Sequence, residues 1–200
     1  MDGPVYSRPA ISLITDTLGP HGASLFIGGG DGASDLGLLR RHGITTVVNC
    51  AVNLDINYVQ GGPASEDIRP TGYGAVRYYK VGLIDGEGSP DTMMLGAYYI
   101  LDGALRQTMP KRHTYPFADG GNVLVNCRSG RSRSVSLVAL YIHRQQRERF
   151  PTIDDAIAHI RERRELRPDE WFETPKPMLL AAAKRASGWI DMIEQKANAG

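Results

Sequence analysis

Cysteine is scarce in this sequence, because two cysteines among 200 residues are too few for the disulfide framework that stabilises small secreted domains. Long apolar runs are missing as well, since none approaches the roughly 20 residues of a membrane-spanning helix. Neither sign of charge is in excess, because 23 Lys and Arg residues face 22 Asp and Glu residues. We therefore expect no membrane span and no nucleic-acid partner.

Signatures of metals and cofactors are also missing. The five histidines have no ligand spacing. The glycine-rich run at residues 28–32 lacks the lysine of a P-loop and the spacing of a dinucleotide fingerprint, so we interpret it as a turn. The sequence therefore indicates no metal and no cofactor.

The length of the chain fits a single domain with a sizeable core. We expect an N-terminal arm at residues 1–10, one domain at residues 11–196 and a tail at residues 197–200. The arm has no apolar core, so we do not expect it to act as a signal peptide.

Strand and helix patterns alternate along the chain, which is typical of α/β layers. Apolar runs predict four strands, at residues 25–27, 45–50, 76–81 and 123–126. Start signals predict five helices, which begin after Ser34, at Pro90, at residue 135, after Thr152 and at residues 174–175.

The most specific feature of the chain is a cysteine separated by five residues from an arginine, at Cys127 and Arg133. An apolar strand precedes this pair and a helix-compatible run, residues 135–147, follows it. A helix start offers unpaired N–H groups and the positive end of the helix dipole, which bind phosphate and lower the pKa of a nearby thiol. The arrangement predicts a thiolate nucleophile that hydrolyses phosphate monoesters through a phosphocysteine.

The other residues of the loop have roles that follow from their chemistry. Arg133 can hold two phosphate oxygens with its planar guanidinium, Gly130 permits a tight curl, and the Ser134 hydroxyl can hydrogen-bond Cys127. Outward-pointing arginines can make the mouth of the pocket positive. We assign phosphate binding to the whole run of loop residues, Arg128, Ser129, Gly130, Arg131, Ser132 and Arg133.

At these residues the chain resembles the dual-specificity branch of the cysteine-dependent protein tyrosine phosphatases. The resemblance extends from about Ile11 to Ala186. It includes four further segments, residues 24–29 (Ser-Leu-Phe-Ile-Gly-Gly), 43–50 (Gly-Ile-Thr-Thr-Val-Val-Asn-Cys), 83–85 (Leu-Ile-Asp) and 167–168 (Arg-Pro). It implies an α/β fold with a central mixed sheet flanked by helices. Within the branch, residues 85–90 and 127–134 are similar to mitochondrial-type phosphatidylglycerophosphate phosphatases.

The resemblance also implies roles outside the loop. Asp85 matches the general acid that protonates the leaving oxygen, with Glu87 and Asp91 as alternatives. Asn126 stands where the family usually has a histidine that supports the loop. Some relatives have a cysteine at a strand end that forms a reversible disulfide with the nucleophile, and Cys50 matches it; the alternative is a small apolar core residue.

Three functions remain open. The first is a phosphatase for phosphotyrosine, phosphoserine or phosphothreonine in proteins. The second is a phosphatase for a lipid or inositol phosphate such as phosphatidylglycerophosphate, and the third is a phosphate-binding pseudophosphatase with low turnover. A nucleophilic thiol favours a reducing, cytoplasmic location.

Three expectations concern the remaining chain. The loops at residues 60–74 and 109–121 either rim the site or are plain connections. Most of the seven arginines between Arg144 and Arg167 are expected on a solvated helix face. Trp171 and Phe172 are expected to anchor the last helix in the core.

Overall fold

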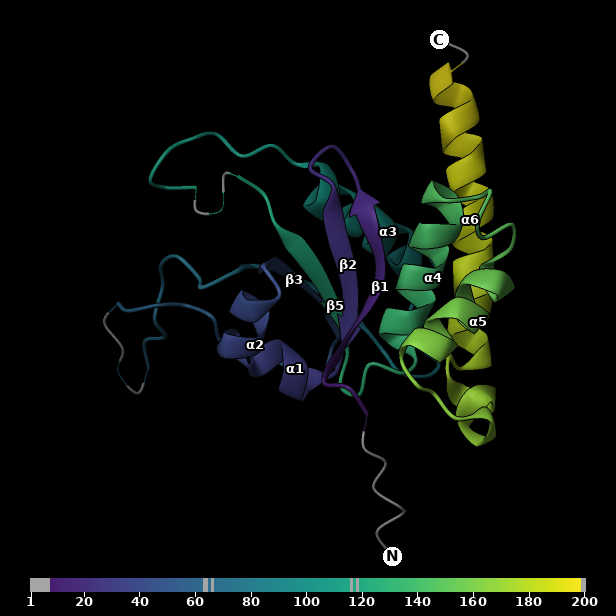
Figure 1. Cartoon of the computed structure of the whole chain (residues 1–200), viewed down its shortest axis with the longest axis horizontal. Coiled ribbons are helices and arrows are strands. Elements are labelled where there is room, and N and C mark those ends of the chain that lie inside the picture. Colours follow the sequence, from purple (N-terminus) through teal and green to yellow (C-terminus); the bar gives the residue numbers. More distant parts are fainter. Residues whose placement is uncertain (1–7, 63–64, 66, 116, 118, 199–200) are drawn as a thin grey trace, which may run out of the picture.

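A five-stranded sheet lies between two groups of helices in the computed structural model, which describes residues 8–62, 65, 67–115, 117 and 119–198 (Figure 1). The strands lie in the order β1-β2-β5-β3-β4. Their bounds are β1 Ile11–Leu18, β2 Ala23–Gly28, β3 Ile44–Ala51, β4 Arg77–Leu83 and β5 Asn122–Asn126. β1 is antiparallel to β2 and the other pairs are parallel, so the predicted mixed sheet is confirmed.

The four predicted strands are present, and β1 is the one that sequence analysis missed. Parallel strands covered on both faces are nearly continuous apolar runs, which made β5 and β3 easy to recognise. β1 contains Ser12, Thr15 and Asp16, and its pairing with β2 shifts register after Leu13 and again after Thr15. These irregularities break the alternation of apolar and polar residues that identifies a half-buried strand.

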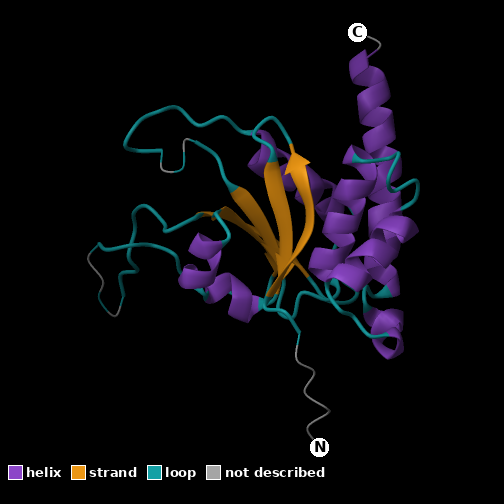
Figure 2. Cartoon of the chain, viewed as in Figure 1, coloured by secondary structure: helices purple, strands orange, loops and turns teal. Residues whose placement is uncertain are grey.

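Helices cover both faces of the sheet (Figure 2). The short helices α1 Gly30–Ser34 and α2 Leu36–Arg41 lie on one face. The other face carries α3 Thr92–Arg106, α4 Arg133–Gln145, α5 Ile153–Arg163 and α6 Pro177–Asn198. A 3₁₀ helix, η1 Pro168–Glu173, precedes α6.

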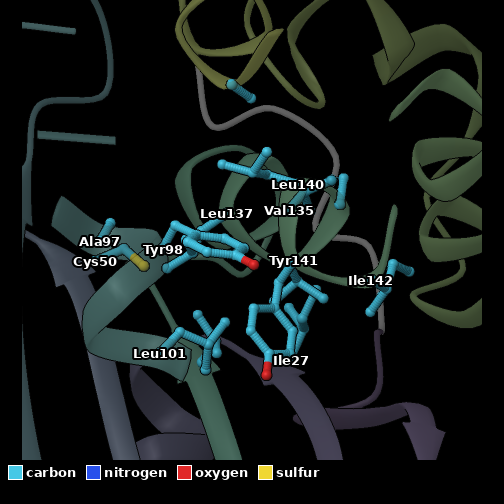
Figure 3. Packing of buried hydrophobic residues seen from close by; sticks show 14 of the residues in the cluster. Ile27, Cys50, Ala97, Tyr98, Leu101, Val135, Leu137, Leu140, Tyr141 and Ile142 are labelled. Atoms are coloured by element: carbon cyan, nitrogen blue, oxygen red, sulfur yellow. The ribbon is translucent and has the colours of Figure 1, made fainter. Parts of the chain in front are cut away.

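The larger core lies between the sheet and α3–α6. α4 is buried on all sides from Arg133 to Ile142, as its apolar sequence predicts. Leu137 and Tyr141 of this helix pack near Tyr98 of α3 (Figure 3). Because α4 is held so completely, its N-terminus and the loop that leads into it have a fixed position.

The helix starts differ from the prediction in four places. α4 begins at Arg133, two residues before the predicted start at residue 135. Asp35, not Ser34, caps α2, because its Oδ1 accepts a hydrogen bond of 2.9 Å from the Leu38 amide. Pro90 and residues 174–175 precede α3 and α6 instead of opening them. The Thr152 cap is confirmed, since its hydroxyl and Asp155 form a reciprocal capping box.

The ends of the chain fall partly outside the described residues. Residues 1–7 of the expected arm and residues 199–200 of the expected tail are not described, and α6 continues to Asn198. Within the described part of the chain, no helix is both long and apolar enough to cross a membrane.

Candidate active site

The candidate site lies where the carboxyl ends of β3, β4 and β5 meet. A cavity of about 140 Å³ opens there. Its lining comes from the segments after these strands and from the connection between η1 and α6: Asn53, Asp85, Cys127, Arg128, Ser129, Arg131, Ser132, Arg133, Glu173 and Lys176. The structure therefore brings Asp85 to the predicted phosphate loop from a separate strand. In α/β sheets this edge is the usual position of a ligand site.

Cys127 lines the cavity, and 3% of its surface is exposed. Its Sγ is 3.3 Å from the Ser134 Oγ. Burial acts to raise the pKa of the Cys127 thiol, but hydrogen bonds from the Ser134 hydroxyl and from the Ser134 and Arg131 amides oppose it, together with the charge of Arg133. These stabilising interactions prevail, so the pKa of Cys127 is lowered and the thiolate is favoured.

Arg133 is the first residue of α4 and is 2% exposed. Its Nη1 donates to the Asn53 Oδ1 at 2.9 Å and to the Leu83 carbonyl at 3.2 Å. Its Nε is buried without a hydrogen-bond partner among the described residues. One edge of the guanidinium is thus anchored, while the Nε donor is left unpaired among the described residues.

Gly130 lets the loop curl between a strand end and a buried side chain. It has φ +66°, and a Cβ at this position would lie 2.7 Å from the Gly28 carbonyl and 2.8 Å from Arg164 Nη2. No side chain fits there. The Gly130 carbonyl accepts a hydrogen bond of 3.3 Å from Arg164 Nε.

Arg164 is a residue of the site that sequence analysis missed. Most of the seven arginines between Arg144 and Arg167 are expected on a solvated face, but Arg164 is 1% exposed and donates to the Pro9 carbonyl at 2.8 Å and to the Ser12 Oγ at 3.1 Å. No carboxylate of the described chain is in ion-pair distance of it, and burial lowers its pKa to about 10. Its spacing from Ile157 and Ile160 continues the buried stripe of α5, which was the signal available in the sequence.

The charge of Arg131 is largely balanced within the protein. Its Nη1 lies 2.9 Å from a Glu170 oxygen and 3.7 Å from a Glu173 oxygen. Glu170 also pairs with Arg8, and these interactions lower the pKa of its carboxyl despite burial. Of the two loop arginines that we expect to point outward, Arg128 and Arg131, Arg128 is exposed, whereas Arg131 is half-buried and ties the loop to η1 through Glu170 and Glu173.

Asp85 is exposed in the segment after β4, and its carbonyl accepts a hydrogen bond of 2.9 Å from Lys176 Nζ. The two alternative acids are placed elsewhere. Glu87 and Asp91 line a different cavity, against α6. Asp91 is held by Arg185 at 2.7 Å, a hydrogen bond that lowers the pKa of the carboxyl. Of the three acids, Asp85 alone lines the cavity with Cys127.

Asn126 is fully buried at the end of β5. Its Nδ2 donates to the Cys127 carbonyl at 3.3 Å, while its Oδ1 has no partner among the described residues. The Asn126 side chain therefore reaches the backbone of the loop from the position where the resemblance implies a histidine.

Cys50 lies on the strand beside the nucleophile. Asn49 of β3 pairs with Asn126 of β5, so the next residues, Cys50 and Cys127, lie side by side. Both cysteines are on the sheet face that also carries Val48 and Val125. Both thiols are free. Burial raises the pKa of the Cys50 thiol, and the charge of Cys127 raises it further.

Two residues that hold the site gave only weak signals in the sequence. Asn53 anchors Arg133, and Lys176 meets both Asp85 and, through its amide, Ser132 at 3.1 Å. Each comes from a loop whose path depends on the tertiary fold. The only signal for Asn53 in the sequence was its position, because it is a small polar residue in the loop that directly follows β3.

Two loops were predicted either to rim the site or to be plain connections. The loop at residues 109–121 joins α3 to the start of β5, at the opposite end of the sheet from the cavity (Figure 1). It is a connection, and its residues 116 and 118 lie outside the described residues. None of the described residues of the loop at 60–74 lines the cavity, and residues 63, 64 and 66 of that loop are not described.

Trp171 and Phe172 are 43% and 74% exposed, so the prediction that they anchor α6 in the core is wrong. The η1 helix turns these rings outward and buries Glu170 in their place. Among the described residues, no group of three or more His, Cys, Asp or Glu side chains is arranged to hold a metal ion.

Solved structures share this architecture. The Yvh1 phosphatase domain from Chaetomium thermophilum matches with a TM-score of 0.61 and 21% identity, over 92% of this chain and 96% of that one. Human DUSP28 matches with a TM-score of 0.58 and 19% identity, over 95% and 99%. The human tyrosine phosphatase-like serine/threonine/tyrosine-interacting protein matches with a TM-score of 0.54 and 22% identity, over 83% and 92%.

No protein-family model matches the sequence, and no curated protein does. The structural comparisons confirm the resemblance to dual-specificity phosphatases at the level of the fold.

Proposed function

We propose that this protein is a cysteine-dependent phosphatase that hydrolyses phosphate monoesters of phosphotyrosine, phosphoserine or phosphothreonine in proteins. The observation that carries the proposal is that Cys127, a thiol of lowered pKa, lines one cavity with Arg133, whose buried Nε has no hydrogen-bond partner in the part of the chain that the structure describes. A buried donor left open costs free energy unless a ligand satisfies it. A phosphate dianion fits both the donor and the amides at the start of α4.

The first chemical step forms a phosphocysteine. The Cys127 thiolate attacks phosphorus as the bond from phosphorus to the ester oxygen breaks, and Asp85 gives its proton to that leaving oxygen. Arg133 and the loop amides hold the three remaining phosphate oxygens throughout.

The second step releases inorganic phosphate. The Asp85 carboxylate takes a proton from a water molecule, which attacks phosphorus while the bond to sulfur breaks. The Ser134 hydroxyl, 3.3 Å from Cys127 Sγ, donates to the departing thiolate. The enzyme returns to its starting state with no cofactor consumed, and a reducing cytoplasm would keep the thiol active.

A pseudophosphatase is the alternative that Asn126 favours. That residue nevertheless reaches the Cys127 carbonyl, and the nucleophile, the arginine and the acid lie in one cavity. An assay of an aryl phosphate separates the two functions, because a binding module would retain the ester without turning it over.

The Cys127→Ser variant tests the mechanism. We expect turnover of an aryl phosphate to fall by roughly 10⁴-fold or more, because serine cannot serve as an anionic nucleophile here. Binding of a phosphopeptide, measured by fluorescence anisotropy, should persist, since Arg133 and the loop amides remain.

Cys50→Ser is the matched control, because it changes the other buried cysteine in the same way. It should retain most of the activity. Turnover that survived in Cys127→Ser, or a loss that was equal in both variants, would contradict the thiolate mechanism.

A further inference from the structure

A second cavity lies beside the phosphate-binding cavity and is not used by the chemistry above. Its volume is about 670 Å³, and it shares Arg128 and Ser129 with the first cavity. The remaining lining residues come from α1, the start of α2 and the segment after β3: Gly30, Asp31, Ser34, Leu36, Leu54, Asp55, Ile56, Asn57 and Tyr58. We call this cavity the side groove.

Hydrogen bonds fix the walls of the side groove, and one of them joins the groove to the phosphate loop. The Gly30 amide donates to the Arg128 carbonyl at 2.9 Å, which ties α1 to the phosphate loop. The Leu54 carbonyl accepts from Asn49 Nδ2 at 2.7 Å, and the Tyr58 hydroxyl donates to the Ala33 carbonyl at 2.6 Å. The groove is therefore preformed, which reduces the cost of ordering it on binding.

One segment lines both cavities in succession. Asn53 holds Arg133 in the phosphate-binding cavity, and Leu54 to Tyr58 continue along the side groove. A substrate whose phosphate sits above Cys127 would place its neighbouring atoms in this groove.

The groove combines apolar surface with carboxylates. Leu36, Leu54 and Ile56 are half-buried, whereas Asp31 and Asp55 are exposed. Asp31 forms no ion pair with any described residue. Asp55 pairs with Lys80, but its side chain is 83% exposed, so water competes with that pair and its net strength is small.

We propose that the side groove binds the chain of a phosphopeptide next to its phosphoresidue and prefers apolar and cationic side chains there. The inference rests on the proposed phosphatase function and adds to it a preference for the residues next to the phosphoresidue. Two carboxylates beside the phosphate site complement lysine or arginine and repel further phosphate or acidic groups. The balance of Arg131 by Glu170 and Glu173 also leaves fewer free cations for a polyphosphorylated ligand.

The test compares peptides with one phosphoresidue and a single lysine moved through the three positions on either side. We expect kcat/KM to rise about threefold to tenfold over an alanine peptide, and only on the side of the phosphoresidue that enters the groove. Glutamate at the same positions should lower kcat/KM by a similar factor. Higher salt should shrink both effects, because the carboxylates are exposed.

Paired variants identify the groove as the cause. The double variant Asp31→Asn/Asp55→Asn should lose the lysine preference, and Asp31→Lys/Asp55→Lys should reverse it. Asp154→Asn is the control, since it removes another exposed aspartate paired with a lysine, at 2.8 Å, outside the linings of both cavities. All variants should hydrolyse an aryl phosphate at the parent rate.

The outcomes separate the two proposals. Normal aryl phosphate turnover without any lysine preference overturns the groove and leaves the phosphatase intact. If turnover is absent, the phosphatase function fails, and binding of the same peptides to Cys127→Ser then tests the groove. Tighter binding of the lysine peptides would support the groove proposal, and equal binding of the lysine and alanine peptides would overturn it. A different outcome would favour an anionic lipid over a peptide. In that case kcat/KM is higher for phosphatidylglycerophosphate in mixed micelles than for the best peptide, and the double asparagine variant raises it further; this result overturns the peptide proposal.

Discussion

At the scale of single residues, the reactivity of Cys127 depends on a balance between burial and donors. Burial acts against the thiolate, and the Ser134 hydroxyl is the first of the donors that oppose it. Removing one donor should therefore weaken the stabilisation of the thiolate, so that the effect of burial is less opposed and the pKa of the thiol rises.

The Ser134→Ala variant tests this balance. A raised pKa means that the thiolate forms at a higher pH, so the acid limb of the activity profile should move upward. Alkylation of Cys127 by iodoacetamide, followed by mass spectrometry between pH 4 and 9, measures the same shift without a substrate. An unchanged alkylation profile would show that the hydroxyl does not stabilise the thiolate.

Residue chemistry could be predicted where it is local in the sequence. Cys127, Arg133 and Ser134 lie within one short loop, and the structure places them together. Arg164 and Asn53 could not be assigned in this way, because their contacts with the loop depend on how α5 and the segment after β3 return to it.

At the scale of elements, the segment after β4 carries Asp85 to the edge of the cavity. The Asp85→Asn variant should lower the rate by roughly 10²–10⁴-fold for alkyl phosphates, because their leaving oxygen needs a proton. The loss should be smaller for an aryl phosphate with a good leaving group. Steady-state rates across a series of leaving groups measure the difference.

The control for this segment is Glu87→Gln, two residues away in a different cavity. It should leave the rate close to that of the parent for every leaving group. An equal loss in Asp85→Asn across the whole series would contradict the role of a general acid.

The pairing of β3 with β5 supports a redox prediction for Cys50. Neighbouring strands are about 4.8 Å apart, within the range of Cα separations that a disulfide spans. Peroxide should oxidise the Cys127 thiolate to a sulfenic acid, with water as the other product, and the Cys50 thiol should then displace a second water to form the disulfide. A dithiol should restore the activity.

Peptide mapping of the oxidised protein should find the bond between Cys50 and Cys127. In Cys50→Ser, less activity should return after peroxide and dithiol, because further oxidation of the sulfenic acid is irreversible. Equal recovery in the parent and the variant would leave Cys50 as a core residue only.

The elements themselves were predictable to different degrees. β5 and α4 are apolar over their length, so their sequences identify both their type and their burial. The irregular β1 and the 3₁₀ helix η1 have no regular apolar period, and only the tertiary packing defines them.

At the scale of the whole molecule, the phosphate loop is braced against the N-terminal segment by two charged side chains. Arg164 links the Gly130 carbonyl to Pro9 and Ser12. Glu170 links Arg131 to Arg8. Segments far apart in the sequence thus meet behind the loop, an arrangement that no local pattern indicated.

The Arg164→Met variant tests this bracing. It leaves buried oxygens without donors, which should reduce the free energy of unfolding by about 3 kcal/mol. It should also reduce the increase in Tm that an oxyanion such as vanadate produces, because such a ligand stabilises the native state in proportion to its affinity. The Gly130 carbonyl would lose its hydrogen bond from Arg164, so the loop amides would be less well ordered around the anion.

Arg163→Met is the matched control for this last prediction. Arg163 is the adjacent arginine of α5, and its Nε donates to the Leu13 carbonyl at 2.9 Å on the exposed surface. This variant should lose some stability but keep the full Tm increase with vanadate. If Arg164→Met also kept the full increase, its role would be confined to stability. A reduced increase in Arg164→Met alone, with a raised KM for an aryl phosphate, would show that a residue outside the cavity sets the geometry of the phosphate loop.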